Sequence, residues 1–154
     1  MVDRLLPRHV DNTYHGYRFA LWLFAVLVLV KVAMSVNSIF NGRLVASSAD
    51  GIPLDTFTPA GAQTVVTMFA LWGLAHVVIC VLCGLVLARY RALVPLMYTL
   101  LLLEQLSRRL IVLVMPIART GTPPGFSVNV GLLVLTVVGL VLSLRSRDHL
   151  HTRG

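Results

Sequence analysis

The stretch Leu100-Leu-Leu-Leu-Glu-Gln-Leu-Ser-Arg-Arg-Leu-Ile-Val-Leu-Val114 places a group of polar side chains inside an otherwise apolar run. On a helix, Glu104 and Arg108 are four residues apart and therefore lie on one face, where they can pair. Gln105 and Arg109 widen this polar face, and the rest of the helix surface is Leu, Ile and Val. Because charged side chains are costly against lipid, we expect the polar face to point towards protein or water.

The composition of the whole chain predicts an all-α integral membrane protein. Of its 154 residues, 57% are hydrophobic and only 12% are charged, and the mean hydropathy is +0.85, which is outside the range of soluble domains. A hydrocarbon core of about 30 Å requires roughly 20 apolar residues on a helix. Four runs meet this requirement, near residues 18–40, 64–88, 92–115 and 127–144. We therefore expect an antiparallel bundle of four transmembrane helices that forms a single membrane domain over residues 1–154.

The net charge of +7 is distributed unevenly between the two sides of the predicted membrane. Eight arginines precede the first run, separate the second from the third, or follow the fourth: Arg4, Arg8, Arg18, Arg89, Arg91, Arg145, Arg147 and Arg153. The opposite connections contain only Arg43 and Arg119. The positive-inside rule then predicts a multi-pass protein of a cell membrane, the inner membrane of a bacterium, with both termini and the tail 145–154 cytoplasmic and the loop 41–63 outside. The basic ends are expected to meet anionic lipid headgroups, and no nucleic-acid partner is expected.

The first run has an alternative interpretation as a cleaved signal peptide. Basic residues precede it, and Ala33-Met-Ser35 offers the small residues of a cleavage site. A membrane span is favoured because the run continues past Lys31 and three more apolar runs follow.

The connections carry signals for where helices begin and turn. Thr58-Pro59 reads as an N-cap followed by the first helical residue, so the second helix should begin about one turn before its span. Only Arg89-Tyr-Arg91 joins the second and third spans, which predicts an antiparallel hairpin. Ser127 is expected to cap the fourth helix. The apolar residues of the loop 41–63 are expected to pack over the helix ends.

Three ionisable residues are predicted to lie at one depth in the membrane. Each lies 13 residues from the arginine at the cytoplasmic end of its span, counting from 18 to 31, from 89 to 76 and from 91 to 104. At 1.5 Å per residue, Lys31, His76 and Glu104 lie about 20 Å above the cytoplasmic face. Ionisable residues inside spans are costly and usually functional. We predict a ligand-binding or proton-linked site that contains these three residues and the polar face of the third span: Lys31, His76, Glu104, Gln105, Arg108 and Arg109.

Each of the three residues also has a purely structural interpretation. Lys31 can extend its long side chain to the outer edge of the membrane. Glu104 and Arg108 can form an ion pair that only stabilises the bundle. His76 can be a hydrogen-bonding group between neighbouring helices.

The motif Cys80-x-x-Cys83, with His76 four residues before it, is a weak candidate for a metal site. Three ligands from one helix leave such a site short of a partner. The residues His76, Cys80, Gly84 and Ala88 also form a row at four-residue spacing, in which small side chains allow helices to approach closely. We therefore interpret the cysteines as packing residues and expect no metal and no cofactor.

Three functions are compatible with this pattern. With His76 neutral, three cations (Lys31, Arg108 and Arg109) oppose Glu104 alone. An excess of two positive charges in a low dielectric favours an accessory or ligand-binding subunit that binds an anionic lipid, a quinone-like ligand or an acidic residue of a partner. The alternatives are an oligomeric proton-coupled small transporter and a membrane enzyme with Glu104 and His76 as acid and base. The chain has no nucleophile motif or phosphate loop, which makes the enzyme less favoured. Expected partners are membrane lipids and either a second copy or a larger membrane complex.

Overall fold

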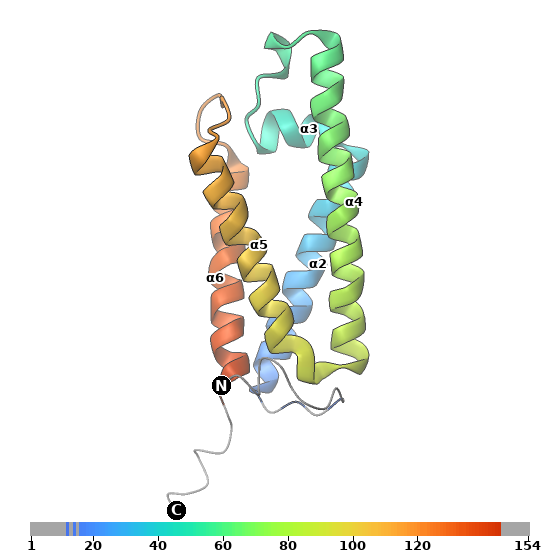
Figure 1. Ribbon diagram of the computed structural model, residues 1–154, viewed down its shortest axis with the longest axis vertical. Coiled ribbons are helices and arrows are strands. Elements are labelled where there is room, and N and C mark those ends of the chain that lie inside the picture. Colours follow the sequence, from blue (N-terminus) through green and yellow to red (C-terminus); the bar gives the residue numbers. More distant parts are fainter. Residues whose placement is uncertain (1–11, 13, 15, 146–154) are drawn as a thin grey trace, which may run out of the picture.

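The computed structural model describes residue 12, residue 14 and residues 16–145 of the chain. In this part every regular element is helical. Four long helices run alongside one another (Figure 1): α2 (Arg18–Phe40), α4 (Pro59–Arg89), α5 (Val94–Val114) and α6 (Pro124–Leu144). Short helical segments join them: α3 (Gly42–Leu44), η1 (Val45–Ala49) and η2 (Leu54–Thr56) before α4, and η3 (Arg91–Leu93) before α5. The predicted tail beyond residue 145 lies outside the described residues, as do Arg4 and Arg8.

Three of the long helices, α2, α4 and α6, are long and apolar enough to cross a membrane. This supports a membrane-embedded protein. The helix α5 has 21 residues, as many as α6, but every 18-residue window within it contains Glu104, Arg108 and Arg109. It is therefore more polar than the other three, and its role as a fourth span stays a prediction.

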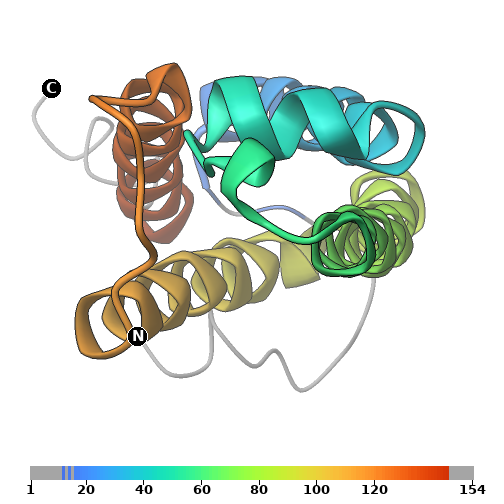
Figure 2. The same ribbon diagram turned by 90° about the horizontal axis from the view of Figure 1, so that it is seen from above.

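The helices α4 and α5 form the predicted antiparallel hairpin, but their axes diverge away from the turn. The short turn at Tyr90 joins them, and α5 then runs obliquely away from α4 towards α6 (Figures 1 and 2). The α5–α6 contact includes the ring of Tyr98, which occupies the space that a side chain at Gly139 would need. The hydroxyl of Tyr98 also donates a hydrogen bond of 2.8 Å to the carbonyl oxygen of Ala20 in α2. A bulky residue on α5 thus fills the centre of the bundle against α2 and α6.

The helices α2 and α4 approach each other closely at Gly73. A Cβ atom at this position would lie 2.7 Å from the carbonyl oxygen of Ser35. The predicted row of small residues is wrong further along α4, because Gly84 has no neighbouring atom within 4 Å of its Cβ position and Ala88 is exposed. A row at four-residue spacing turns by about 40° at each step, so its last members rotate out of the interface. The buried face continues through Cys83 instead.

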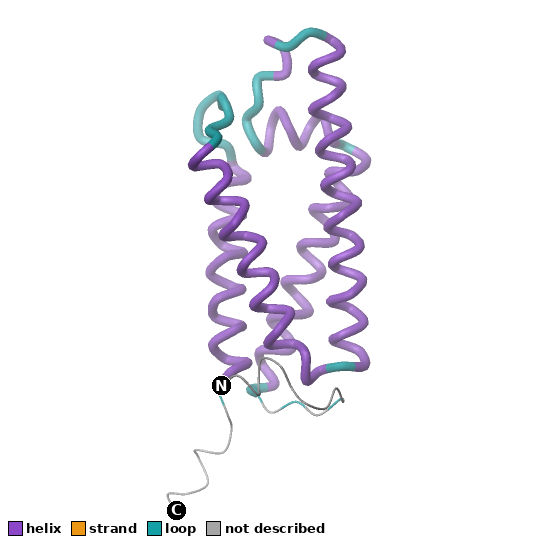
Figure 3. Tube along the Cα trace, viewed as in Figure 1, coloured by secondary structure: helices purple, strands orange, loops and turns teal. Residues whose placement is uncertain are grey.

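Loops lie at the two ends of the helices (Figure 3). One end, which we call the basic end because Arg18, Arg89, Arg91 and Arg145 lie there, contains the starts of α2 and α5 and the ends of α4 and α6. The opposite end is covered by residues 42–57, which we call the cap. Ala46, Ile52 and Leu54 of the cap pack against α4. The backbone N–H of Thr120, in the α5–α6 connection, donates a 2.8 Å hydrogen bond to the carbonyl oxygen of Gly51. Gly51 has φ +70°, a conformation that favours glycine. The expected packing of the apolar residues of this loop over the helix ends is confirmed for Ile52 and Leu54, whereas Leu44 and Phe57 are exposed.

The two predicted helix starts have different outcomes. The N-cap at Thr58 is confirmed, because its hydroxyl accepts a 3.2 Å hydrogen bond from the N–H of Gly61 and Pro59 is the first residue of α4. The N-cap at Ser127 is wrong, because α6 already begins at Pro124. Proline is favoured as the first residue of a helix, since its φ is helical and the missing N–H would have no partner there. Ser127 therefore lies inside the first turn.

Candidate functional site

The carboxylate of Glu104 is the centre of a polar cluster formed by three helices. The Nζ atom of Lys31 on α2 lies 3.1 Å from its Oε2, and the Nε2 atom of His76 on α4 lies 3.3 Å from its Oε1. The Nε atom of Arg108, one turn along α5, lies 3.9 Å from Oε1. The three residues that the depth count placed in one layer are thus in direct contact. Their role in binding or proton transfer stays a prediction.

The cluster is largely removed from the surface of the protein. The side chain of Lys31 is 8% exposed, that of His76 13% and that of Glu104 24%. The alternative in which Lys31 extends to the edge of the membrane is wrong, because its ammonium group contacts Glu104 in the interior. Ammonium and carboxylate groups at this burial require each other as partners, since an isolated buried charge is strongly disfavoured.

Arg108 connects the cluster to two further residues. Its Nη2 atom donates a 2.9 Å hydrogen bond to Oδ1 of Asn129 on α6, and its guanidinium lies 5.1 Å from the ring centre of Trp72. The ring of His76 packs edge to face against Trp72, with centroids 5.0 Å apart. Sequence analysis missed both Trp72 and Asn129. The signals were present, because Trp72 is four residues before His76 and Asn129 is a polar residue near the start of an apolar run.

Two of the predicted site residues do not join the cluster. Gln105, which is buried, donates a 2.9 Å hydrogen bond to the hydroxyl of Thr136, and this hydroxyl in turn donates to the carbonyl oxygen of Leu132. Gln105 thus belongs to the packing of α5 on α6. The guanidinium of Arg109 lies 6.0 Å from the ring centre of Phe126, outside the residues that contact Glu104. Neighbouring residues on a helix differ in direction by about 100°, which separates Arg109 from Arg108.

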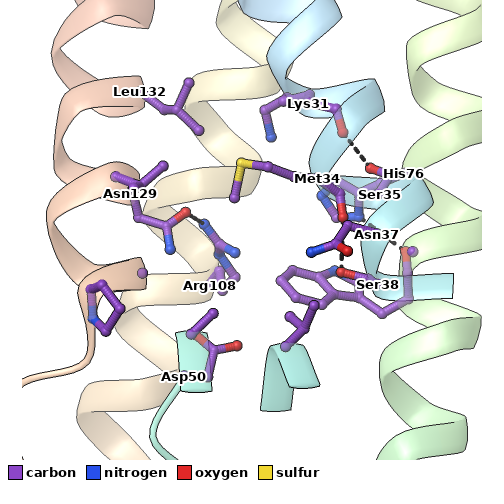
Figure 4. Close-up of a pocket in the computed structure, with 17 residues that line it drawn as sticks. Lys31, Met34, Ser35, Asn37, Ser38, Asp50, His76, Arg108, Asn129 and Leu132 are labelled. Carbon is purple, nitrogen blue, oxygen red and sulfur yellow. Dashed lines mark hydrogen bonds between the residues drawn. The ribbon is translucent and has the colours of Figure 1, made fainter. Parts of the chain in front are cut away.

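A cavity of about 280 Å³ lies between the cluster and the cap (Figure 4). Lys31 and Leu132 are at one end of the view, Asp50 of the cap is at the other, and Arg108 lies between them. His76 also lines the cavity, whereas Glu104 is not among the lining residues. All four long helices and the cap contribute to the wall.

The cavity wall offers hydrogen-bond donors near the cluster from Lys31 and Asn129. The ammonium of Lys31 has three N–H groups and makes one hydrogen bond, to Glu104. The amide oxygen of Asn129 accepts from Arg108, which leaves its NH₂ group as a donor. Both ring nitrogens of His76 already face acceptors, namely the carbonyl oxygen of Trp72 at 3.2 Å and the carboxylate of Glu104. The arrangement suits a bound group that carries oxygen acceptors.

The charges around the cavity differ from those counted in the sequence. Because Arg109 lies outside the cluster, Lys31 and Arg108 oppose Glu104 with an excess of one positive charge instead of two. At the other end of the cavity, Asp50 adds a carboxylate that sequence analysis did not include. Burial raises the pKa of this carboxyl, and the positive charges of Arg119 and Arg108 lower it. Lys31, Arg108 and Asp50 therefore line the cavity, Glu104 lies behind the two cations, and Arg119 is a further positive charge near Asp50.

Among residues 12, 14 and 16–145, no group of three His, Cys, Asp or Glu side chains is arranged to bind a metal ion. Cys80 and Cys83 are buried free thiols that pack in the main hydrophobic core. The Nε2 atom of His76 faces Glu104.

Compared with known proteins, the chain matches no family, and no curated protein or solved structure shows significant similarity to it.

Proposed function

We propose that the chain is a multi-pass protein of a cell's inner membrane, in which α5 is the fourth span of a four-helix bundle and both termini are cytoplasmic. The distribution of arginines supports this topology. In the described residues, Arg18, Arg89, Arg91 and Arg145 all lie at the basic end. Positively charged residues favour the cytoplasmic side, so the cap faces outwards.

A membrane-impermeant thiol reagent tests this topology in intact cells. The single substitutions Ser48→Cys in the cap and Arg145→Cys at the basic end both fall on exposed positions. The native Cys80 and Cys83 are buried and should not react. Labelling is expected at residue 48 in intact cells and at residue 145 only after lysis. Labelling of residue 145 from outside contradicts the proposal.

We propose that the protein is a ligand-binding or accessory membrane subunit. The convergence of donors from Lys31, Arg108 and Asn129 on one cavity is the observation that supports this function. These residues come from three different helices, so the bundle holds the donors in place before a ligand arrives, which favours binding. Oxygen acceptors that match them occur in lipid phosphates, in quinone-like rings and in acidic side chains of a partner protein or of a second copy. At about 30 Å³ for each water molecule, the cavity has room for roughly nine waters or a group of similar size.

Two adjacent arginines provide a matched test of this function. Arg108→Gln removes a cation from the cavity, whereas Arg109→Gln removes the same charge from a position outside the cluster. The parent protein, gently solubilised, is expected to retain a ligand that native mass spectrometry detects. Arg108→Gln should lose most of this ligand, and Arg109→Gln should retain it. Equal retention by both variants contradicts a ligand site at Arg108.

A proton-coupled oligomeric transporter is the second candidate, and the three-way contact at Glu104 supports it. A carboxylate that contacts both an ammonium and an imidazole can exchange protons with its neighbours as the pH or the ligand changes. Proton-dependent uptake into liposomes that disappears in Glu104→Gln favours this candidate over simple binding. The enzyme alternative has less support, because both ring nitrogens of His76 face acceptors within the protein and neither is directed at a substrate.

A further inference from the structure

We infer that the ligand of this cavity is zwitterionic, with anionic oxygens between Lys31 and Arg108 and a cationic amine beside Asp50. This inference rests on the proposed function, since it requires that the cavity bind a ligand. It narrows the ligand class to molecules that combine a phosphate or carboxylate with an ammonium group. Both the headgroup of a membrane lipid and a free small molecule can supply this combination.

The balance of charges around the cavity disfavours a simple anion. An anion beside Lys31 gains from that ammonium and from Arg108, but Glu104 already pairs with both cations. The same anion also faces Asp50 along the cavity (Figure 4). Like charges repel, and in a partly buried site water screens this repulsion less than at a free surface. An amine on the ligand converts the repulsion at Asp50 into attraction.

Asp50 is positioned to receive such an amine. Its backbone N–H donates to the carbonyl oxygen of Val45, and its carboxylate makes no hydrogen bond within the described residues. At Gly125 a Cβ atom would lie 3.4 Å from Oδ1 of Asp50 and still closer to the backbone of the cap. The absence of a side chain at Gly125 therefore lets the first turn of α6 lie against the cap, which holds the carboxylate at the cavity wall.

The positive charges of Arg119 and Arg108 both act on Asp50, but neither arginine forms an ion pair with it in the described part of the chain. The guanidinium of Arg108 is engaged elsewhere. It donates to Asn129, lies over the ring of Trp72 and contacts Glu104. The carboxylate therefore keeps oxygen acceptors for an ammonium group, which has several N–H donors.

A pair of probes that differ only in the amine tests the inference. Glycerophosphoethanolamine carries a phosphodiester and an amine, whereas glycerophosphoethanol carries the same phosphodiester without the amine. The chain has two tryptophans, so in a Trp22→Phe background the fluorescence of Trp72, at the cavity wall, reports binding. The amine-bearing probe should bind about tenfold more tightly than the amine-free probe, which corresponds to one charge-assisted contact.

Two aspartates of the cap provide the variant and its control. Asp50→Asn should reduce the preference for the amine-bearing probe to less than roughly twofold. Asp55→Asn removes the same charge from an exposed position that does not line the cavity, and it should leave the preference unchanged. Asp55→Asn should keep its affinity for glycerophosphoethanol, and Asp50→Asn should bind this amine-free probe at least as tightly as the parent does, because a like charge is removed. Loss of preference in both variants alike would overturn a specific role for Asp50.

A second arm of the experiment determines whether the ligand is a lipid headgroup or a free small molecule. The full-length protein is placed in nanodiscs that contain either phosphatidylethanolamine or phosphatidylglycerol, and native mass spectrometry measures the lipid retained. Retention of phosphatidylethanolamine without binding of the soluble probe assigns the site to a lipid headgroup, and the reverse assigns it to a free molecule. If both probes or both lipids bind equally and Arg108→Gln abolishes binding, the proposed function stands and the zwitterionic ligand is refuted. If neither the probes nor the lipids bind, the zwitterionic ligand is refuted, and the ligand retained by the parent and by Arg108→Gln in native mass spectra decides the proposed function.

Discussion

The substitution Glu104→Gln is expected to destabilise the protein strongly, because it removes a carboxylate that contacts both Lys31 and His76. Hydrogen bonds to charged groups contribute about 1.5–3 kcal/mol each. Glutamine keeps the size of the side chain and one acceptor oxygen, so it can replace one of the two bonds in weakened form. Glu104 is also 24% exposed, and water compensates part of the loss. We therefore expect the free energy of unfolding to fall by about 3 kcal/mol, near the lower limit for breaking a buried pair.

Chemical unfolding in detergent, followed by circular dichroism, measures this change. Ser107→Ala on the same helix is the control, because Ser107 is exposed and makes no hydrogen bond through its side chain in the described residues. It should change the free energy of unfolding by less than about 0.5 kcal/mol. Adding Lys31→Met to Glu104→Gln should restore part of the stability, since the unpaired ammonium is removed. If Glu104→Gln unfolds like Ser107→Ala, water already solvates the carboxylate and the buried cluster does not exist.

Three further predictions concern packing, polar contacts and pH. Thr136→Val removes the acceptor of the buried amide of Gln105 and should destabilise the protein by about 1–3 kcal/mol in the same unfolding assay. Gly73→Ala should destabilise by about 1–3 kcal/mol, because its methyl group meets a carbonyl oxygen of α2, whereas Gly84→Ala meets open space and should be neutral or stabilising by up to about 1 kcal/mol. Because burial raises the pKa of the Asp50 carboxyl above its ordinary 3.8 in the folded protein, the folded state becomes less stable as the pH rises through that range. Asp50→Asn without ligand should therefore raise the melting temperature at pH 7, and the gain should vanish below pH 3.8.

The depth of the charged residues could be predicted because the rise of a helix per residue is constant. Counting from the arginines at the basic end was enough to place Lys31, His76 and Glu104 in one layer. The rotation and tilt of α5 could not be predicted in this way, because they depend on side-chain packing such as the contact of Tyr98 with Gly139. Only the packed structure therefore shows that Arg108 lines the cavity and that its neighbour Arg109 does not.

Asp50 could not have been assigned to the site from its position in the sequence. It lies in a connection between two helices, far along the chain from the charged residues of α5. Its place at the cavity depends on the cap, which the hydrogen bond from Thr120 to Gly51 holds against the α5–α6 connection. Contacts of this kind join segments about 70 residues apart, and no local pattern of hydrophobicity encodes them.

The helix α5 cannot enter a membrane by itself as readily as its three neighbours. A charged side chain at the centre of an inserting helix costs about 3 kcal/mol on the scales derived from the translocon, and α5 contains Glu104, Arg108 and Arg109. Its apolar residues offset only part of this cost. During synthesis, however, α2 and α4 emerge first and already carry Lys31 and His76, the partners of Glu104. In the proposed topology with four spans, the ion pair that organises the folded protein therefore also makes the insertion of α5 depend on the helices made before it.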